Sequence, residues 1–326
     1  MRDPSLTDLL SEAGWGVFLH YLAPVVAGDD VDPATWQRLV AGVDVEGLAD
    51  QLADCGAGYL FVTLGQNSGY YLSPNATYDR IVGHEPSRCA ERDLVADLQA
   101  ALAPRGIHLL VYLPSGAPDR DERAMEAFGW RKGTQPVHAR PTRGADETDR
   151  PWGLENPRLE GFQRTWEAVI AEWSERWGER VRGWWFDGCY YPEMYESPFP
   201  PNWTSLCAAA RAGNPASILA FNPGVMVDLM VLTEQQDYAA GEISDTFPPC
   251  TGRWIHGVQW HVLSYLGDTW GHGEELRFAD DFAERYTRAA VEHGGAVTWD
   301  VPPRPDGLIE DVFLQRLRAI GAVARG

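Results

Sequence analysis

The sequence lacks any long hydrophobic run, and no stretch approaches the roughly 18 apolar residues of a membrane-spanning helix. Its first residues, MRDPSLTDLLSEAGWG, show no charged leader followed by an apolar core and a small-residue cleavage site. We therefore expect a cytoplasmic protein that has no membrane partner.

Basic residues are also scarce. Lys and Arg number 27 against 47 Asp and Glu, the formal net charge is -20, and no basic cluster interrupts the acidic excess. Nucleic acids and anionic lipid surfaces bind clustered positive charge, so both are poor candidate partners. Most of the acids are expected to form a solvated surface, and only an acid in an unusual local setting calls for a functional interpretation.

Cysteine is infrequent and unpaired in the sequence. The five cysteines are odd in number, widely spaced and without CxxC spacing, which favours reduced thiols over a disulfide framework or a zinc site. No HxH or HExxH pattern occurs, and His256 and His261 would point to opposite faces of a regular strand. We therefore expect neither a metal site nor a cofactor.

Short runs rich in β-branched and aromatic residues are abundant, and they alternate with longer amphipathic segments typical of helices. This alternation, with eight candidate strands, predicts an α/β fold with a (β/α)8 TIM-like barrel in a single domain over residues 1–326. A doubly wound open sheet is the main alternative. The candidate strands are 16–21, 59–64, 107–113, 182–187, 217–222, 238–242, 255–260 and 296–301.

A long connection follows the third candidate strand, at about 114–156, and is rich in Gly, Pro and charged residues. Connections of this length in a compact domain are usually functional or disordered. A lid or wall of a substrate cleft and a flexible or oligomer-contacting insertion both remain open interpretations.

In a barrel of this type, the chemistry gathers at the carboxyl ends of the strands. Several residues fall at or just beyond such ends in the predicted scheme. These residues are His20, Gln66, Asn67, Asp187, Asn222, Glu242, Trp260 and Asp300.

Asp187 has the most unusual setting, because it ends the apolar run of WWFDGCYY and would be costly to bury without partners. It could cap the next helix or pair with an arginine. The functional interpretation is a nucleophile or general base, and glycoside hydrolysis then requires a second carboxyl group. Glu242 in QDYAAGE is the best candidate, with Glu234 and Glu193 as alternatives.

Four motifs in chain order resemble the catalytic barrel of the glycoside hydrolase family 29 α-L-fucosidases. They are WGVFLHY, GWWFDG, DYAAGE and HGGAVTWDVPPRPDGLIEDVFLQRL. The resemblance spans almost the whole chain and implies a retaining exo-glycosidase. It places Asp187 on the nucleophile, Glu242 where at least some members have the acid/base, and His20 on a sugar-binding histidine.

The sequence also departs from the family pattern. In TLGQNSGYY, Gln66 and Asn67 replace the paired histidines that hold the sugar's hydroxyls in the family. An amide pair can donate and accept hydrogen bonds but cannot become cationic. Asp300 stands where the family usually has Asn, and we expect no counterpart of the C-terminal β-sandwich that is common in the family.

Aromatic faces stack on the C–H surfaces of sugars, although core packing accounts for most aromatic residues and a lone histidine is more often structural. We expect the substrate to be bound by residues at the barrel mouth. The candidates are His20, Gln66, Asn67, Tyr70, Trp185, Asn222, Trp254, Trp260 and Asp300.

The sequence thus predicts a retaining exo-glycosidase of the α-L-fucosidase type that hydrolyses a terminal fucose or related sugar from a small carbohydrate or glycoside by double displacement. Asp187 and Glu242 are the expected catalytic pair. The alternative is a non-catalytic glycan-binding barrel derived from a glycosidase, although such a protein has little need for both carboxylates. A barrel hydrolase with metal-assisted chemistry lacks a supporting motif.

Overall fold

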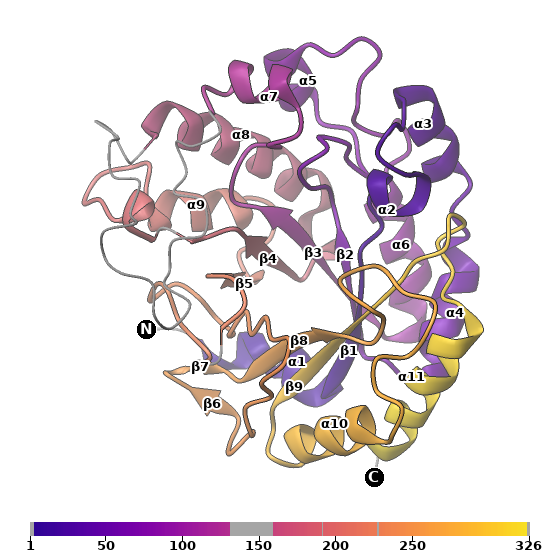
Figure 1. Cartoon of the computed structure of the whole chain (residues 1–326). Helices are drawn as coiled ribbons and strands as arrows, with labels where there is room; N and C mark the ends of the chain where they lie inside the picture. Colours follow the sequence, from indigo (N-terminus) through magenta and orange to yellow (C-terminus); the bar gives the residue numbers. More distant parts are fainter. Residues whose placement is uncertain (1–2, 131–158, 191, 227, 325–326) are drawn as a thin grey trace.

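The computed structural model describes residues 3–130, 159–190, 192–226 and 228–324, which form an α/β fold (Figure 1). Seven parallel strands make a curled sheet in the order β5-β4-β3-β2-β1-β9-β8. These strands are β1 (Trp15–Leu19), β2 (Tyr59–Thr63), β3 (His108–Pro114), β4 (Gly183–Asp187), β5 (Ile218–Phe221), β8 (His261–Tyr265) and β9 (Ala296–Val301).

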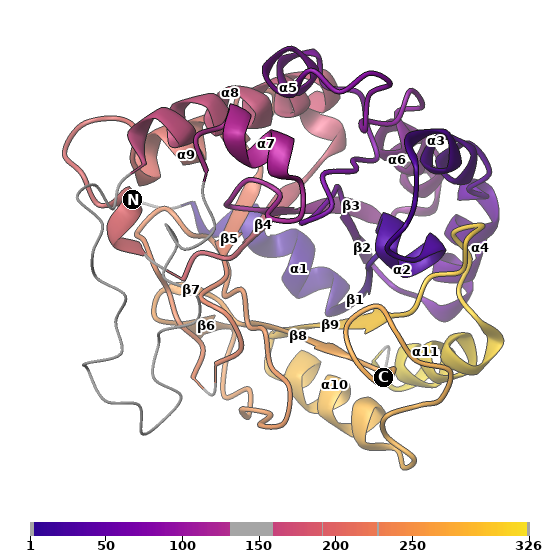
Figure 2. The ribbon, with the colours of Figure 1, turned by 45° about the horizontal axis from the view of Figure 1, so that its top comes forward.

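Helices surround the outer side of the sheet (Figure 2). The α-helices are α1 (Asp8–Ala13), α2 (Ala23–Ala27), α3 (Pro33–Ala41), α4 (Val45–Cys55), α5 (Ala76–Val82), α6 (Leu94–Leu102), α7 (Glu122–Ala127), α8 (Glu160–Trp177), α9 (Trp203–Ala210), α10 (Phe282–Glu292) and α11 (Asp311–Ala324). The short 3₁₀ helices are η1 (Pro4–Thr7), η2 (Ala103–Arg105), η4 (Gly178–Arg180) and η5 (Pro192–Tyr195).

Many helix starts follow directly from the sequence, because an Asp or Asn side chain can accept a hydrogen bond from a backbone N–H of the first turn. Such caps precede α3, α4, α5, α6 and α9. The capping residues are Asp32, Asp44, Asn75, Asp93 and Asn202.

Alternate residues of the strands face two different cores, as expected for the side-chain period of a strand. On β1, Phe18 belongs to the apolar cluster inside the curled sheet, whereas Val17 and Leu19 belong to the cluster shared with the helices. On β3, Leu110 and Tyr112 face inward. The same alternation that builds the inner core therefore directs Tyr112 toward the carboxyl end of the interior.

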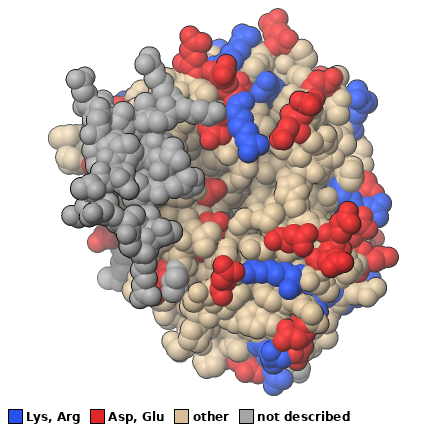
Figure 3. All heavy atoms as spheres, in the orientation of Figure 1, with Lys and Arg blue, Asp and Glu red and all other residues tan. Residues whose placement is uncertain are grey.

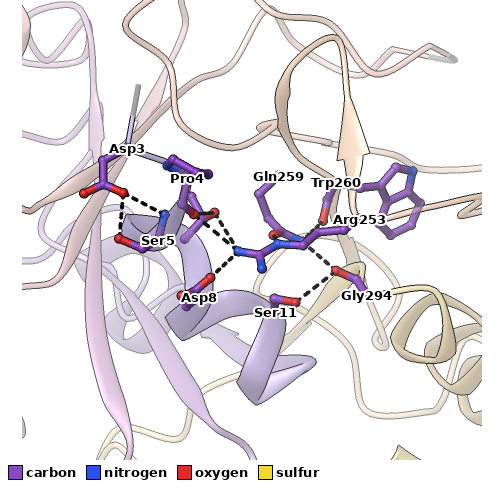
Figure 4. Close-up of polar contacts among 10 residues, drawn as sticks. Asp3, Pro4, Ser5, Asp8, Ser11, Arg253, Gln259, Trp260 and Gly294 are labelled. Atoms are coloured by element: carbon purple, nitrogen blue, oxygen red, sulfur yellow. Dashed lines mark hydrogen bonds and ion pairs between the residues drawn. The ribbon is translucent and has the colours of Figure 1, made fainter. Parts of the chain in front are cut away.

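The amino end of the sheet is closed by the N-terminal segment. Leu9 and Leu10 of α1 join the inner apolar cluster. Arg253 ties α1 to the strands: its guanidinium donates to Asp8 at 2.5 Å and to the side-chain oxygen of Gln259 at 2.9 Å (Figure 4). Gln259 in turn donates to the carbonyl of Gly294 at 2.8 Å, just before β9. This end of the molecule is filled by packing and internal hydrogen bonds.

Six of the predicted strands are confirmed, with ends within two residues of those expected. The predicted strand 255–260 is wrong. Its residues belong to an antiparallel hairpin of β6 (Trp254–Ile255) and β7 (Val258–Gln259), and β8 begins only at His261. His256 and Gly257, at φ +49° and +79°, form the turn, a conformation that suits a tight hairpin.

The predicted strand 238–242 is also wrong as a regular strand. Residues 237–243 instead make two isolated parallel bridges to the β7–β8 region. The N–H of Leu263 donates to the carbonyl of Gly241 at 2.8 Å, and the N–H of Asp237 donates to Leu219 of β5 at 2.8 Å. This irregular segment carries Glu242. A closed eight-stranded barrel therefore stays a prediction, and the sheet itself has seven strands.

The surface carries charges of both signs. In Figure 3, Lys and Arg side chains lie next to Asp and Glu side chains around the edge of the face shown. Among the described residues, no helix is long and apolar enough to cross a membrane. The five cysteines are free thiols, and all but Cys250 are buried.

Candidate active site

A cavity of about 370 Å³ opens at the carboxyl end of the sheet, within the range of roughly 300–1,000 Å³ typical of small-molecule sites. Because the strands are parallel, their last residues meet there. The lining residues are Phe18, His20, Leu22, Pro24, Val25, Gln66, Asn67, Ser68, Tyr112, Arg120, Trp185, Asp187, Tyr190, Glu242, Leu263, Trp270 and His272.

Two carboxylates, Asp187 and Glu242, are held together by one amide. The side-chain nitrogen of Asn222 donates to Oδ1 of Asp187 at 2.8 Å and to Oε2 of Glu242 at 2.6 Å. Because both bonds start from one atom, these two oxygens are at most 5.4 Å apart, the sum of the two distances. The amide oxygen accepts from the N–H of Gly224, which fixes the direction of the amide group.

Asp187 is further oriented by residues of its own strand and of β3. Oδ1 also accepts from the N–H of Gly188 at 2.7 Å, and Oδ2 accepts from the hydroxyl of Tyr112 at 2.5 Å. Gln66 donates to the same hydroxyl at 2.7 Å. The Tyr112 ring stacks on Trp185, with centroids 5.4 Å apart. A chain of hydrogen bonds therefore runs from Gln66 through Tyr112 to Asp187.

The surroundings of Glu242 change its pKa. Burial, together with the negative charge of Asp187, raises the pKa of Glu242 to about 8, while the hydrogen bond from Asn222 opposes the rise. One member of the pair is suited to hold a proton at neutral pH, as a general acid requires.

His20 follows β1 and borders the same cavity. Its Nδ1 lies 2.7 Å from Oδ1 of Asp300, a fully buried carboxylate of β9. Asp300 does not line the cavity and reaches it through His20. Asn222 is likewise fully buried behind the acids.

Three of the proposed aromatic contacts are not brought to the cavity. Tyr70 is buried and donates its hydroxyl to the carbonyl of Val31 at 3.0 Å. Trp254 is in the β6–β7 hairpin, and Trp260 is the residue before β8, packed near Gly295 at the amino end of the sheet. Trp260 is expected at a carboxyl end only if residues 255–260 form one strand, and that predicted strand is wrong.

Of the two alternative acids, only Glu234 has a described side chain. Glu234 is exposed and does not line the cavity. The backbone of Glu193 lies in η5, but its side chain is outside the described part of the structure. Of the long connection, residues 114–130 are described and contribute Arg120 to the cavity, and 131–156 lie outside the described residues, so its role stays a prediction.

Sequence reasoning missed eleven lining residues, and six of them have side chains that can form hydrogen bonds: Ser68, Tyr112, Arg120, Tyr190, Trp270 and His272. Tyr112 was detectable, since it shares the inward face of its strand with Leu110. Trp270 and His272 lie in the loop after β8, and a correct end for that strand would have pointed to them. In the described part of the chain, no group of three or more His, Cys, Asp and Glu side chains is arranged to hold a metal ion.

No protein-family model matches the chain, and no match was found among curated proteins. Solved structures do match. An endo-fucoidan hydrolase from glycoside hydrolase family 107 has 16% sequence identity and a TM-score of 0.68, over 98% of this chain and 93% of that chain. A mutant of the α-L-fucosidase AlfC has 13% identity and a TM-score of 0.66, over 99% and 98% of the two chains.

An α-L-fucosidase of glycoside hydrolase family 29 from Bacteroides thetaiotaomicron has 15% identity and a TM-score of 0.61, over 99% of this chain and 73% of that chain. The chain therefore has the fold of fucose-directed glycoside hydrolases. At these identities the likeness concerns the fold, and membership of family 29 stays a prediction.

Proposed function

We propose that the protein is a retaining exo-glycosidase of the α-L-fucosidase type, which releases a terminal fucose or related sugar from a small glycoside. The observation that carries this proposal is the pairing of Asp187 and Glu242 through Asn222 at one cavity. Retaining glycosidases hold their carboxyl groups roughly 5–5.5 Å apart, and inverting ones roughly 6.5–9.5 Å. The upper bound of 5.4 Å between the facing oxygens supports the first class.

The two acids take different roles in a double displacement. Asp187 attacks the anomeric carbon while Glu242 donates its proton to the leaving oxygen, which gives a glycosyl-enzyme and a free alcohol. Bond formation removes the negative charge of Asp187, and that charge is one cause of the raised pKa of Glu242. Glu242 then becomes a stronger acid and is left as carboxylate, ready to accept a proton from the water that cleaves the ester.

The lining of the cavity supports a deoxy sugar. Leu22, Pro24 and Val25 supply an apolar part of the wall, whereas His20 and Gln66 supply polar groups. A 6-deoxy sugar such as fucose presents a methyl group and several hydroxyl groups, so it matches both kinds of surface. Trp185 and Trp270 add aromatic faces on which sugar C–H groups can stack.

A panel of 4-nitrophenyl glycosides tests the substrate. We expect release of nitrophenol from the α-L-fucoside, or from a related α-L- or β-D-glycoside with the same ring stereochemistry, and little from the other members. If no glycoside is cleaved while free fucose still binds in calorimetry, the glycan-binding alternative replaces the enzyme.

An Asp187→Gly variant tests the nucleophile. Turnover should fall by on the order of 10⁴-fold or more, because no group remains to form the covalent intermediate. Added azide should restore turnover on the nitrophenyl substrate and give a glycosyl azide of inverted configuration. The matched control is Asp30→Gly, which changes an exposed aspartate in a surface turn and should retain full activity. Full activity of Asp187→Gly itself would rule out the assignment.

A further inference from the structure

Three segments that are distant in sequence meet at the carboxylate of Asp300. The residue belongs to β9 and is fully buried. Its Oδ1 lies 2.7 Å from Nδ1 of His20, and its Oδ2 accepts a hydrogen bond from the N–H of Gly271 at 2.6 Å. We propose that Asp300 is a positioning residue that fixes the tautomer of His20 and attaches the 267–273 turn, which carries Trp270 and His272, to the cavity wall.

The tautomer of His20 follows from the chemistry of its partner. A carboxylate only accepts hydrogen bonds, so Nδ1 of His20 carries the hydrogen that lies toward Asp300. In the neutral ring, Nε2 then has a lone pair. No described residue bonds Nε2, and His20 borders the cavity. His20 therefore presents an acceptor, rather than a donor, to a ligand.

The turn is attached closely to the same histidine. Gly271 has φ +69°, and a Cβ atom at this position would lie 2.6 Å from Cβ of His20. The ring of Trp270 lies 6.0 Å from the His20 ring and 4.9 Å from the Tyr265 ring. The backbone of His272 closes the turn, with its carbonyl accepting from Asp268 at 2.9 Å. His20 and the 267–273 turn are consequently both held by hydrogen bonds to Asp300.

Part of this inference rests on the proposed function, namely that the acceptor on His20 receives a hydroxyl hydrogen of the sugar. The arrangement of Asp300, His20 and Gly271 does not rest on it. A test on the ligand-free protein therefore separates the two, because the tautomer can be read without a substrate.

Replacing Asp300 by Asn is the sharpest perturbation, since it preserves shape and changes hydrogen-bond character. The N–H of Gly271 can only donate, so the single amide oxygen of Asn must face it. The amide nitrogen then faces Nδ1 of His20 and can only donate to it. His20 has to move its hydrogen to Nε2, and its acceptor toward the cavity becomes a donor.

Nitrogen-15 NMR of histidine-labelled protein measures this change. The chain has eight histidines, and the ring signals that disappear in His20→Gln identify His20. The wild type should show His20 protonated at Nδ1, and Asp300→Asn should show it protonated at Nε2. For turnover of the preferred nitrophenyl glycoside, KM should rise roughly tenfold in Asp300→Asn, with a much smaller change in kcat, because one hydrogen bond to the sugar changes direction.

Asp237→Asn is the matched control. Asp237 is another buried carboxylate, which accepts from Arg211 at 2.6 Å and from the N–H of Leu219 at 2.8 Å. The Asp237→Asn variant should be less stable but should leave the nitrogen-15 signals of the His20 ring unchanged. A wild-type His20 protonated at Nε2 would overturn the proposal even if Asp300→Asn failed to fold, and so would an unchanged tautomer in a folded Asp300→Asn. An inactive protein with the expected tautomers would contradict only the proposed function.

Discussion

Both ends of the sheet contain hydrogen-bonded polar side chains, but these side chains have different surroundings. At the amino end, Arg253 and Gln259 are bonded to α1 and to the start of β9, and Leu10 fills the interior. At the carboxyl end, Asp187 and Glu242 are also hydrogen-bonded, yet both border a cavity. The amino end of the sheet is packed, whereas the carboxyl end leaves two carboxyl groups accessible from a cavity.

Two histidines show the difference most clearly. His261, at the start of β8, has both ring nitrogens occupied, by the carbonyl of Ala239 at 2.9 Å and the hydroxyl of Thr298 at 2.8 Å. Burial lowers its pKa to about 4, so it is neutral and structural. His20 has one nitrogen occupied by Asp300 and borders the cavity. Of these two histidines, only His20 has a ring nitrogen that no described residue bonds.

The largest effect is expected from Asn222→Ala at the carboxyl end. Removing the shared donor should lower kcat on the order of 100- to 1,000-fold, the usual result of removing one preorganised donor. The matched control is Asn214→Ala at the amino end. Asn214 is also buried, donates to Val181 at 3.0 Å and accepts from the N–H of Ala216.

Asn214→Ala should lose about 1–3 kcal/mol of unfolding free energy and retain kcat within about twofold. Steady-state kinetics and denaturant unfolding of both variants check the contrast. Equal kcat losses in the two variants would mean that the ends of the sheet are not functionally distinct.

A second contrast compares one substitution at both ends. Leu10→Ala should reduce the free energy of unfolding by about 2–5 kcal/mol, because it leaves a cavity inside a closed core, with little change in kcat. Leu22→Ala, beside the cavity, should cost less stability and should raise KM instead. Denaturant midpoints and KM values measure both. A larger stability loss from Leu22→Ala would contradict the picture of a closed amino end.

The smallest effect concerns pH. Since the pKa of Glu242 is raised to about 8, kcat/KM should fall about tenfold per pH unit above that value, as the general acid loses its proton. On substrates with good leaving groups, Glu242→Gln should not show this alkaline decrease in kcat/KM, whereas Glu234→Gln, a change at an exposed residue, should retain it. An alkaline decrease that persists in Glu242→Gln would assign the general acid to another residue.

The same shift affects stability with a defined sign. A carboxyl group whose folded pKa is raised stabilises the protein fully below its unfolded pKa, near 4.5, and this contribution is lost as the pH rises through about 8. The unfolding free energy of wild type, relative to Glu242→Gln, should therefore decrease across this interval.

Much of the fold could be predicted from the sequence because most strands are bounded by unambiguous signals. The runs around Phe61 and Trp184 are apolar and β-rich, and each ends at a polar residue or glycine. The run around Trp254 to Trp260 has the same composition, but His256 and Gly257 turn the chain back. The hairpin differs from a single strand in the positive φ of His256 and Gly257. The amino-acid composition does not reveal these angles.

The candidate site was predictable to a similar degree. Position at a strand end identified Asp187, and motif order identified Glu242, both of which line the cavity. The bridging role of Asn222 and the link between Gln66 and Tyr112 could not be derived, because they depend on side-chain directions across different strands. The sequence indicated some of the polar groups that border the cavity, such as Gln66, but not which of them are hydrogen-bonded to one another.

The irregular segment 237–243 supports its carboxyl group in a different way from β4. Asp187 ends β4, which pairs with β3 up to Asp187 and with β5 up to Phe186, so its place is tied to the architecture. Glu242 is located by isolated bridges and by Gly241 at φ +64°. The position of Glu242 therefore depends on a small number of buried contacts, since Ala240 and Ile243 beside it are fully buried. We expect small changes in this segment to displace the proposed proton donor, whereas the proposed nucleophile keeps its place as long as β4 pairs with its neighbours.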